Sequence, residues 1–258
     1  MRSISRSARW LVRSSVIGQE GSNVQAVVLC GGLATRMLPA TRDVPKVLLP
    51  VAGRPFLDHL VTRLRTAGFV DIVLLAGHLA EHVELAALAL GRDVSVVRDG
   101  PGLLGTAGAL AAAADRLAPS FLVTYGDSYL PFDYAAPLRA LSPTPKEVLG
   151  TMSVWRNEDT LEPSNASVAD GFVIRYDKRR EPGEPRLDHI DYGATALKKE
   201  ALALVPAGEP AGLDALQAEL ARTRRLGAYL AGTRFYEIGS PDGLRALEAH
   251  LTAGRSRA

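Results

Sequence analysis

Residues 26–37 read Ala-Val-Val-Leu-Cys-Gly-Gly-Leu-Ala-Thr-Arg-Met, and residues 43–50 read Asp-Val-Pro-Lys-Val-Leu-Leu-Pro. The apolar run that opens the first stretch predicts a buried β-strand, because it is short, rich in valine and followed by a turn signal. The glycine pair after it lets the backbone approach a ligand and expose its N–H groups. Such N–H groups form an anion-binding hollow, and Arg36 and Lys46 bring two cations to the same region. The two stretches therefore predict a cradle for a polyphosphate.

This glycine loop belongs to neither of the common phosphate-binding motifs. No Gly-Lys-Ser/Thr follows it at the spacing of a Walker A loop, and Ala34 and Met37 interrupt the glycine pattern of the dinucleotide fingerprint. The combination of Gly-Gly-x-x-Thr-Arg-Met with the later Pro39-Ala40-Thr41 and Pro45-Lys46 instead resembles the signature of the sugar-1-phosphate nucleotidylyltransferases, or nucleotide-sugar pyrophosphorylases. Ala34 stands where that family most often has glycine. The resemblance extends over roughly residues 24–252.

Composition narrows the class of protein. The 258 residues suffice for one large α/β domain with a substantial core. A formal charge of +2 provides no basic field for nucleic acid, and no apolar run approaches the ~20 residues of a membrane helix. The single cysteine, Cys30, excludes an intrachain disulfide framework and favours a cytoplasmic location. We expect no nucleic-acid or membrane partner, and a homodimer is compatible with the sequence.

The domain organisation follows from where these patterns begin. Residues 1–23 alternate arginine with serine and are expected to form a disordered N-terminal extension. We expect residues 24–252 to form a single nucleotidylyltransferase domain. Its nucleotide-binding half is predicted over residues 24–130 and its sugar-phosphate-binding half over residues 131–252.

Strands and helices are expected to alternate through the first half. A parallel sheet covered on both faces follows from such an order, and its ligands bind beyond the carboxyl ends of the strands. The glycine pair, Gly77 and Gly126-Asp127 all fall at such ends, so they are expected to meet in one crevice. After the first strand, the periodicity predicts strands over 71–76, 94–97 and 121–125 and helices over 55–67, 79–89 and 107–117.

The second half changes character, with strands joined by shorter connections. Strands are expected over 146–156, 171–177 and 188–197, a hairpin turn at 169–171, and helices over 213–222 and 241–251. No hexapeptide repeat is present, so no β-helix domain is expected. The fold class is α/β: the resemblance implies a Rossmann-like, mixed and mainly parallel sheet flanked by helices, as in the glycosyltransferase-A-like nucleotidyltransferases.

Nucleotidylyl transfer needs positioning and charge neutralisation more than covalent help from the protein. Mg²⁺ is the cofactor that the resemblance implies, and this ion takes one or two carboxylates together with phosphate oxygens. Asp127, directly after a predicted strand, matches a metal-binding aspartate of the family. Glu237 stands where the family has its second metal-binding aspartate, within Phe235-Tyr236-Glu237-Ile238-Gly239. Glutamate reaches one methylene further, so the site must adjust to it.

The resemblance also assigns the remaining site residues, which fall into three groups. Catalytic roles are implied for Arg36, Lys46 and Asp127. Nucleotide binding is implied for Leu29, Gly31, Gly32, Thr35, Arg36, Lys46, Gly77, Gly105 and Thr106. Binding of the sugar phosphate is implied for Gly126, Asn165, Lys178, Asp191 and Tyr192, with Lys178 on the phosphate.

The implied activity joins a nucleoside triphosphate to a sugar 1-phosphate and releases pyrophosphate. The Gly-Thr-Ala-Gly segment at residues 105–108 resembles heptose-1-phosphate and mannose-1-phosphate guanylyltransferases. It therefore favours GTP and D-glycero-α-D-manno-heptose 1-phosphate as substrates. Thymidylyl, uridylyl or cytidylyl transfer to another sugar or alcohol phosphate remains open, and so does a catalytically inactive nucleotide-sugar sensor.

Overall fold

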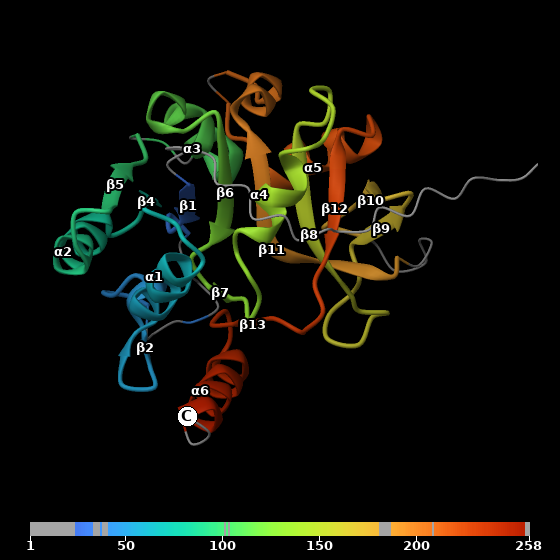
Figure 1. The fold of residues 1–258 in the computed structure, drawn as a ribbon. Helices are drawn as coiled ribbons and strands as arrows, with labels where there is room; N and C mark the ends of the chain where they lie inside the picture. Colours follow the sequence, from blue (N-terminus) through green and yellow to red (C-terminus); the bar gives the residue numbers. More distant parts are fainter. Residues whose placement is uncertain are drawn as a thin grey trace, which may run out of the picture.

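A nine-stranded mixed sheet runs through the described part of the chain, with the strand order β5-β4-β1-β6-β11-β8-β12-β10-β9 (Figure 1). The structure is a computed structural model that describes residues 24–32, 37, 41–100, 102, 104–180, 187–207 and 209–255. Residues 254 and 255 are described by their backbone only. The expected extension at residues 1–23 therefore lies outside the described residues. Among those that are described, no helix is both long and apolar enough to cross a bilayer.

The bounds of the elements are as follows. The sheet contains β1 (Gln25–Leu29), β4 (Asp71–Ala76), β5 (Val94–Arg98), β6 (Ser120–Tyr125), β8 (Gly150–Arg156), β9 (Ala166–Ala169), β10 (Phe172–Tyr176), β11 (His189–Lys198) and β12 (Leu226–Leu230). Two small sheets pair β2 (Pro50–Val51) with β3 (Arg54–Pro55) and β7 (Ser128–Tyr129) with β13 (Tyr236–Glu237). The α-helices are α1 (Phe56–Thr66), α2 (Ala80–Leu90), α3 (Gly105–Ala112), α4 (Ala136–Leu141), α5 (Leu213–Arg222) and α6 (Pro241–Arg255).

The first half of the sheet is parallel, as expected. β1 pairs in parallel with β4 on one side and with β6 on the other, and β4 pairs in parallel with β5. Antiparallel pairs prevail beyond β6, where β11 runs against both β6 and β8. The predicted mixed sheet is confirmed, with its parallel part concentrated in β5-β4-β1-β6 and a further parallel pair between β8 and β12.

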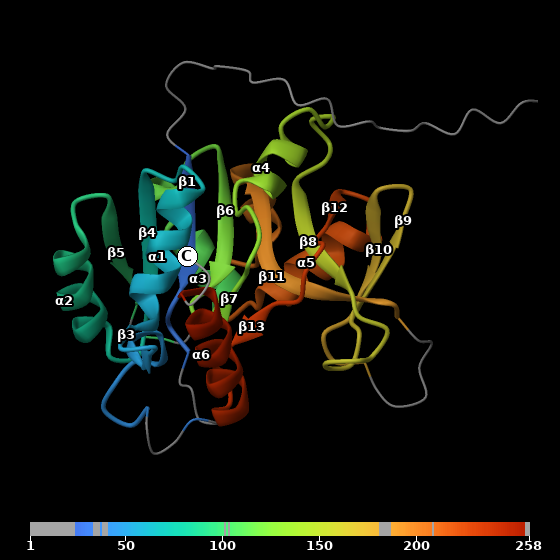
Figure 2. The same ribbon diagram turned by 60° about the horizontal axis from the view of Figure 1, so that its bottom comes forward.

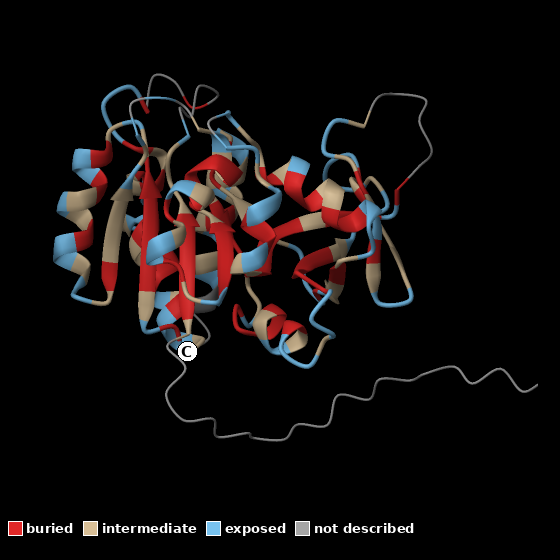
Figure 3. Cartoon of the chain, turned by 90° about the horizontal axis from the view of Figure 1, so that it is seen from above, coloured by how far each residue is buried: buried red, intermediate tan, exposed pale blue. Residues whose placement is uncertain are grey.

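Two apolar cores cover the faces of this sheet. One contains buried residues of α1, α2 and α6, and the other contains those of α3 and α5. Figure 2 shows α1 and α6 in front of the first strands, and Figure 3 shows buried residues concentrated along the strands and exposed ones on the outer helix surfaces. Because helices cover both faces, β1 and β4 are apolar throughout their centres instead of alternating.

Local signals explain the boundaries that were predicted closely. α1 ends before Gly68, which has φ +91° and so adopts the left-handed conformation that ends many helices. The predicted hairpin turn is confirmed between β9 and β10, where Asp170 and Gly171 both have positive φ (53° and 80°). Positive φ at both central residues suits the twist of a two-residue hairpin.

Several predicted boundaries were wrong, and one of them is the end of the last helix, since α6 continues to Arg255 instead of ending at residue 251. The expected helix over 107–117 begins earlier and ends earlier, since α3 spans Gly105–Ala112 and a separate 3-10 turn follows over Ala114–Arg116. The strand expected from residue 146 begins only at Gly150. In α3 the early start depends on a distant partner, because the Ala211 carbonyl accepts hydrogen bonds from the N–H groups of Ala107 and Gly108.

Candidate active site

A crevice of about 550 Å³ opens at the carboxyl ends of β1 and β6, the edge where the sequence placed the ligand. Since the chain passes from β1 to β4 on one side and later to β6 on the other, this edge is a topological switch point of the parallel sheet. Close packing there requires small residues. A Cβ on Gly31 would lie 3.2 Å from the Gly77 nitrogen, and one on Gly126 would lie 2.9 Å from the Leu29 carbonyl oxygen. The three predicted glycine turns therefore do meet.

Most of the predicted nucleotide-binding residues border this crevice. Gly77 does not line the crevice itself but packs behind Gly31. Thr35 and Arg36 lie outside the described residues. The predicted residues that line the crevice are Leu29, Gly31, Gly32, Lys46, Gly105, Thr106, Gly126 and Asp127.

Lys46 and the two predicted metal ligands form the charged centre of the crevice. Lys46 Nζ donates to Asp127 Oδ2 at 2.7 Å, and both side chains are largely shielded from solvent. A Cβ on Gly239 would lie 3.2 Å from both Lys46 Nζ and Glu237 Oε1, so the ammonium and this second carboxylate lie close together as well. The lysine cation therefore lies near both carboxylates.

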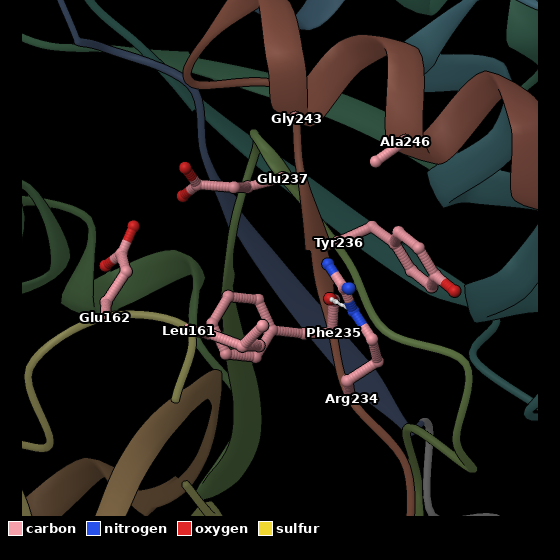
Figure 4. Close-up of a pocket in the computed structure, with 8 residues that line it drawn as sticks. All are labelled: Leu161, Glu162, Arg234, Phe235, Tyr236, Glu237, Gly243 and Ala246. Carbon is pink, nitrogen blue, oxygen red and sulfur yellow. Dashed lines mark hydrogen bonds between the residues drawn. The ribbon is translucent and has the colours of Figure 1, made fainter. Parts of the chain in front are cut away.

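Backbone pairing brings Asp127 and Glu237 together although they are far apart in sequence. β13 pairs antiparallel with β7, which places Glu237 opposite Ser128, and the Ile238 N–H donates to the Asp127 carbonyl at 2.9 Å. Successive strand residues point to opposite sides. Figure 4 accordingly shows the Glu237 carboxylate on one side of this segment and the Tyr236 ring on the other.

The C-terminal helix holds this segment from behind. The Tyr236 ring stacks on His250 of α6, with centroids 4.4 Å apart, and the Arg234 guanidinium lies 4.8 Å from the same ring. The backbone of Gly243 also packs closely against the Glu237 carbonyl, since a Cβ there would lie 2.4 Å from that oxygen. These contacts fix the position from which the Glu237 side chain extends.

The residues at this centre fit a divalent cation. Asp127, which directly precedes β7, and Glu237 of the paired strand β13 provide carboxylate oxygens of the kind that Mg²⁺ takes as ligands. Within the described part of the chain there is no cluster of three or more His, Cys, Asp or Glu side chains able to enclose a metal ion.

The far end of the crevice is formed by Gly105 and Thr106 at the start of α3. Gly105 has φ +70°, and a Cβ on it would lie 2.5 Å from the Ala211 carbonyl oxygen, so glycine is required there. The Thr106 hydroxyl accepts a hydrogen bond from the Leu213 N–H at 2.7 Å and thus caps α5. Thr106 therefore joins the crevice to the helix of the other half.

Asp99, at the end of β5, is a crevice residue that the sequence reasoning missed. Its carboxylate lies against Gly31 and Gly77, at 2.8 and 2.7 Å from the positions of added Cβ atoms. Burial raises the pKa of this carboxyl group. It has no hydrogen bond or ion pair to any described residue. The available signal was an acidic residue two positions after the end of a predicted strand, the same position that Asp127 has after its own strand.

Lys178, one of the predicted sugar-phosphate residues, lies beside Tyr125, which also lines the crevice. Lys178 Nζ lies 5.3 Å from the centre of the Tyr125 ring. Asp191 accepts hydrogen bonds from the Gly193 N–H at 2.9 Å and the Tyr176 hydroxyl at 3.1 Å. Burial raises the pKa of Asp191, while the Gly193 N–H, the Lys178 charge and the Tyr176 hydroxyl act in the opposite direction.

Asn165 is tied to the same strand. Its Oδ1 accepts a hydrogen bond from the Asp191 N–H at 2.8 Å, and its own N–H donates to the His189 carbonyl at 2.9 Å. The side chain is thereby held in one orientation next to Asp191. Lys178, Asp191 and Asn165 are thus brought together by β10, β11 and the segment before β9.

The assignment of Tyr192 to sugar binding is wrong. Its side chain is only 1% exposed and packs edge-on against Phe132 and Phe235, while its hydroxyl lies 3.3 Å from the Arg234 carbonyl. Neighbouring residues of a strand face opposite sides of the sheet, so Asp191 and Tyr192 cannot both face the same site. The sequence pattern did not reveal which of the two faced the core.

Cys30 lines the crevice but is a poor nucleophile. Burial raises the pKa of its thiol to about 12, with further contributions from the negative charges of Asp127 and Asp99. The thiolate is the reactive form of cysteine, and here it is strongly disfavoured. A structural role suits this thiol better than a catalytic one.

The chain is similar in sequence to curated nucleotidylyltransferases that act on sugar phosphates. The chain is 34% identical over 129 residues to the N-acetylmuramate alpha-1-phosphate uridylyltransferase of Neisseria meningitidis, covering 48% of this chain and 56% of that protein. It is 39% identical over 97 residues to the mannose-1-phosphate guanylyltransferase of Mycobacterium tuberculosis, covering 36% and 27%. The chain thus spans little more than half of the first relative's length.

A solved structure supports the same fold. HddC from Yersinia pseudotuberculosis, solved in complex with GMP-PN, superposes with a TM-score of 0.71 at 22% identity, covering 88% of this chain and 99% of that one. The family model described as the MobA-like NTP transferase domain matches residues 26–185, which include the glycine loop, Lys46, Asp127 and Lys178. The chain therefore belongs to the family of MobA-like NTP transferases.

Proposed function

We propose that this chain transfers a guanylyl group from GTP to a sugar 1-phosphate, giving a GDP-sugar and pyrophosphate, with D-glycero-α-D-manno-heptose 1-phosphate as the preferred acceptor. The observation that carries the proposal is the juxtaposition of Lys46, Asp127 and Glu237 in a crevice between a glycine loop and the Gly105-Thr106 turn. In this proposal residues 24–130 hold the nucleotide and residues 131–252 hold the sugar phosphate.

The reaction is a displacement at the α-phosphorus of the triphosphate. A phosphate oxygen of the acceptor forms a bond to that phosphorus, the bond to the bridging oxygen breaks, and pyrophosphate leaves with the electron pair. Lys46 neutralises charge on the triphosphate and the leaving group, for which its ammonium must exchange Asp127 for phosphate oxygens. Lys178 neutralises the acceptor phosphate. Asp127 and Glu237 would hold Mg²⁺, which supplies further charge neutralisation when bound.

Asp99 supports guanine as the base. Guanine presents N1–H and N2–H₂ donors side by side, and a carboxylate can accept from both. Uracil and thymine present one N–H between two carbonyl oxygens. One of these carbonyl oxygens would face the second oxygen of the carboxylate, and two acceptors repel each other. Because Asp99 lies in the crevice without a partner among the described residues, it is available for this contact. The guanylyltransferase among the relatives agrees with this choice, whereas the uridylyltransferase favours uridylyl transfer as the alternative.

The function is tested by measuring pyrophosphate release with each of the nucleoside triphosphates against a panel of sugar 1-phosphates and alcohol phosphates. We expect the highest kcat/KM with GTP and a manno-configured heptose or hexose 1-phosphate. A clear preference for UTP, TTP or CTP would retain nucleotidylyl transfer but contradict the guanine assignment. Absence of turnover with every pair, together with tight binding of a nucleotide sugar, would support the sensor alternative.

Asp99→Asn should weaken the preference for GTP. The substitution keeps the size of the side chain but replaces one acceptor oxygen by an NH₂ donor, so the paired contact to guanine is lost. A bidentate contact of this kind discriminates between bases by about 1–3 kcal/mol, so the ratio of kcat/KM for GTP to that for UTP should fall ~10-fold. An unchanged ratio in steady-state kinetics would exclude Asp99 from base selection.

Lys178→Ala should raise KM for the sugar 1-phosphate far more than KM for the triphosphate. The reason is that Lys178 is proposed to contact only the acceptor phosphate, next to Tyr125. Steady-state kinetics with each substrate varied in turn measures both constants. Lys199→Ala, which removes a lysine of the turn after β11, serves as the control. Equal changes in both KM values would place Lys178 elsewhere.

A further inference from the structure

A second cavity, of about 140 Å³, lies beside the Glu237–Gly239 segment, whose Gly239 lines the nucleotide crevice. Its walls come from a loop between β8 and β9, from the segment that leads into β13, and from α6 (Figure 4). At ~30 Å³ per water molecule, its volume corresponds to a few waters, so it can receive part of a sugar. The residues that line it are Leu161, Glu162, Arg234, Phe235, Tyr236, Glu237, Gly243 and Ala246.

The position of this cavity ties it to the transfer reaction. Glu237, one of the proposed metal ligands, lines the small cavity, and Gly239, two residues later, lines the nucleotide crevice. A group bound in the cavity would therefore lie next to the place where the acceptor phosphate meets the triphosphate. None of the predicted sugar-phosphate residues lines this cavity.

Residues 157–164 form a loop, the 157–164 loop, that is held by an internal hydrogen-bond network. Asn157 Nδ2 donates to the Glu162 carbonyl at 2.7 Å and to Ser164 Oγ at 3.0 Å, and Asn157 Oδ1 accepts from the Leu161 N–H at 3.0 Å. Asn157 and Ser164 are 1% and 0% exposed. Two polar side chains are thus buried to shape a loop whose tip is exposed.

The outer part of the loop is fixed as well. Glu158 and Asp159 both have positive φ, at 50° and 60°, a conformation that non-glycine residues adopt rarely. Asp159 accepts a hydrogen bond from the Ser164 N–H at 2.7 Å and forms an ion pair at 3.0 Å with Arg180, both side chains being mostly buried. A surface loop held this firmly presents its side chains in one arrangement, which lowers the entropy lost on binding.

The loop presents Leu161 and Glu162 to the cavity, opposite Phe235. A sugar ring has C–H faces that suit leucine and phenylalanine side chains and hydroxyl groups that donate to a carboxylate. Glu162 has no hydrogen bond or ion pair from its side chain to any described residue, so its oxygens can accept from a ligand. Arg234 also lines the cavity, but its guanidinium lies over the Tyr236 ring and donates to the Phe235 carbonyl. The carboxylate and apolar side chains that remain match a neutral polyhydroxylated ring.

We propose that the 157–164 loop selects the acceptor: Glu162 accepts hydrogen bonds from hydroxyl groups of the sugar of the sugar 1-phosphate, and Leu161 and Phe235 pack against the ring. This inference rests on the proposed transferase function and adds residues that determine the acceptor. A site that hydrogen-bonds a hydroxyl rejects analogues that lack it, because the polar group in the protein is then left unpaired.

The test compares Glu162→Gln with Glu158→Gln in the same loop. Glu158 is the matched control because it is exposed and its carboxylate pairs with Arg156 at 2.6 Å, away from the cavity. Initial rates are measured with GTP and UTP as donors and with the 1-phosphates of D-glycero-D-manno-heptose, mannose, glucose and N-acetylglucosamine as acceptors. Glu162→Gln should raise KM for the best acceptor at least ~10-fold and leave KM for the triphosphate within ~2-fold. Glu158→Gln should match the wild type in both.

Deoxy analogues of the best acceptor provide the second readout. The wild type should lose efficiency with the analogue that lacks the contacted hydroxyl, and Glu162→Gln should lose much less with that same analogue. If KM for the acceptor is unchanged in Glu162→Gln while the wild type is active, or if both KM values change equally, the loop does not select the acceptor. A wild type that is inactive with every donor and acceptor would contradict the proposed function itself. That result differs from an active wild type whose acceptor KM does not depend on Glu162.

Discussion

Lys46→Ala should lower the rate of nucleotidylyl transfer at least ~100-fold, which corresponds to about 2.7 kcal/mol of lost transition-state stabilisation. Its ammonium lies 2.7 Å from Asp127, and both it and Glu237 Oε1 lie beside Gly239. Removal takes away a charge that the leaving pyrophosphate needs, and it also breaks the ion pair with Asp127. The same loss is expected for Arg36→Ala, on the sequence prediction that Arg36 contacts the triphosphate.

Pre-steady-state measurement of pyrophosphate release gives the rate of the chemical step in these variants. Lys146→Ala is the matched control, because Lys146 is an exposed lysine in the turn before β8, outside both cavities. It should match the wild type. Wild-type turnover in Lys46→Ala would contradict a catalytic role for this residue, provided that circular dichroism shows the variant to be folded.

Glu237→Gln should abolish measurable turnover and weaken binding of the divalent cation. The change removes the negative charge but keeps the size of the side chain. The fold should persist, because β13 is held by backbone pairing with β7 and by the stack of Tyr236 on His250. Titration with Mn²⁺ in the presence of a non-hydrolysable GTP analogue, followed by electron paramagnetic resonance, measures the affinity independently of activity.

Glu237→Asp separates the charge from the reach of the side chain. It restores the carboxylate that the resembling family has at this position, so it should retain substantial activity and Mn²⁺ affinity. Chelation of divalent cations should stop the wild type, and added Mg²⁺ should restore it. Full activity and unchanged Mn²⁺ affinity in Glu237→Gln would mean that Glu237 is structural. An inactive wild type that gains activity through Glu237→Asp would favour the sensor alternative.

The order of strands and helices could be predicted from the sequence because local patterns decide it. Apolar runs such as residues 71–76 and the helical stripe of α1 depend on a few neighbouring residues, and both are confirmed. The start of α3 could not be predicted, because it depends on hydrogen bonds to Ala211, which lies about a hundred residues later. The direction of the later strands is likewise decided by which strands become neighbours.

The residues of the candidate site likewise fall into those that short motifs predict and those that only tertiary contacts reveal. The glycine loop, Lys46 and Asp127 were found from short motifs, and the structure brings the described ones together in one crevice. Asp99 carries no motif, and only the neighbouring ends of β5, β4 and β1 make it a crevice residue. Tyr192 was misassigned because strand alternation predicts that adjacent residues diverge but not which one faces the core.

The sequence by itself determined the parallel first half of the sheet, its glycine turns and the charged residues that follow its strands. These features depend on backbone freedom and apolar periodicity within short segments. Only the tertiary structure decided that Lys46 lies near both Asp127 and Glu237, and that the 157–164 loop faces Phe235 across a second cavity. The physical reason is that these contacts join segments distant in sequence, whose proximity arises from strand pairing and helix packing and not from any local preference.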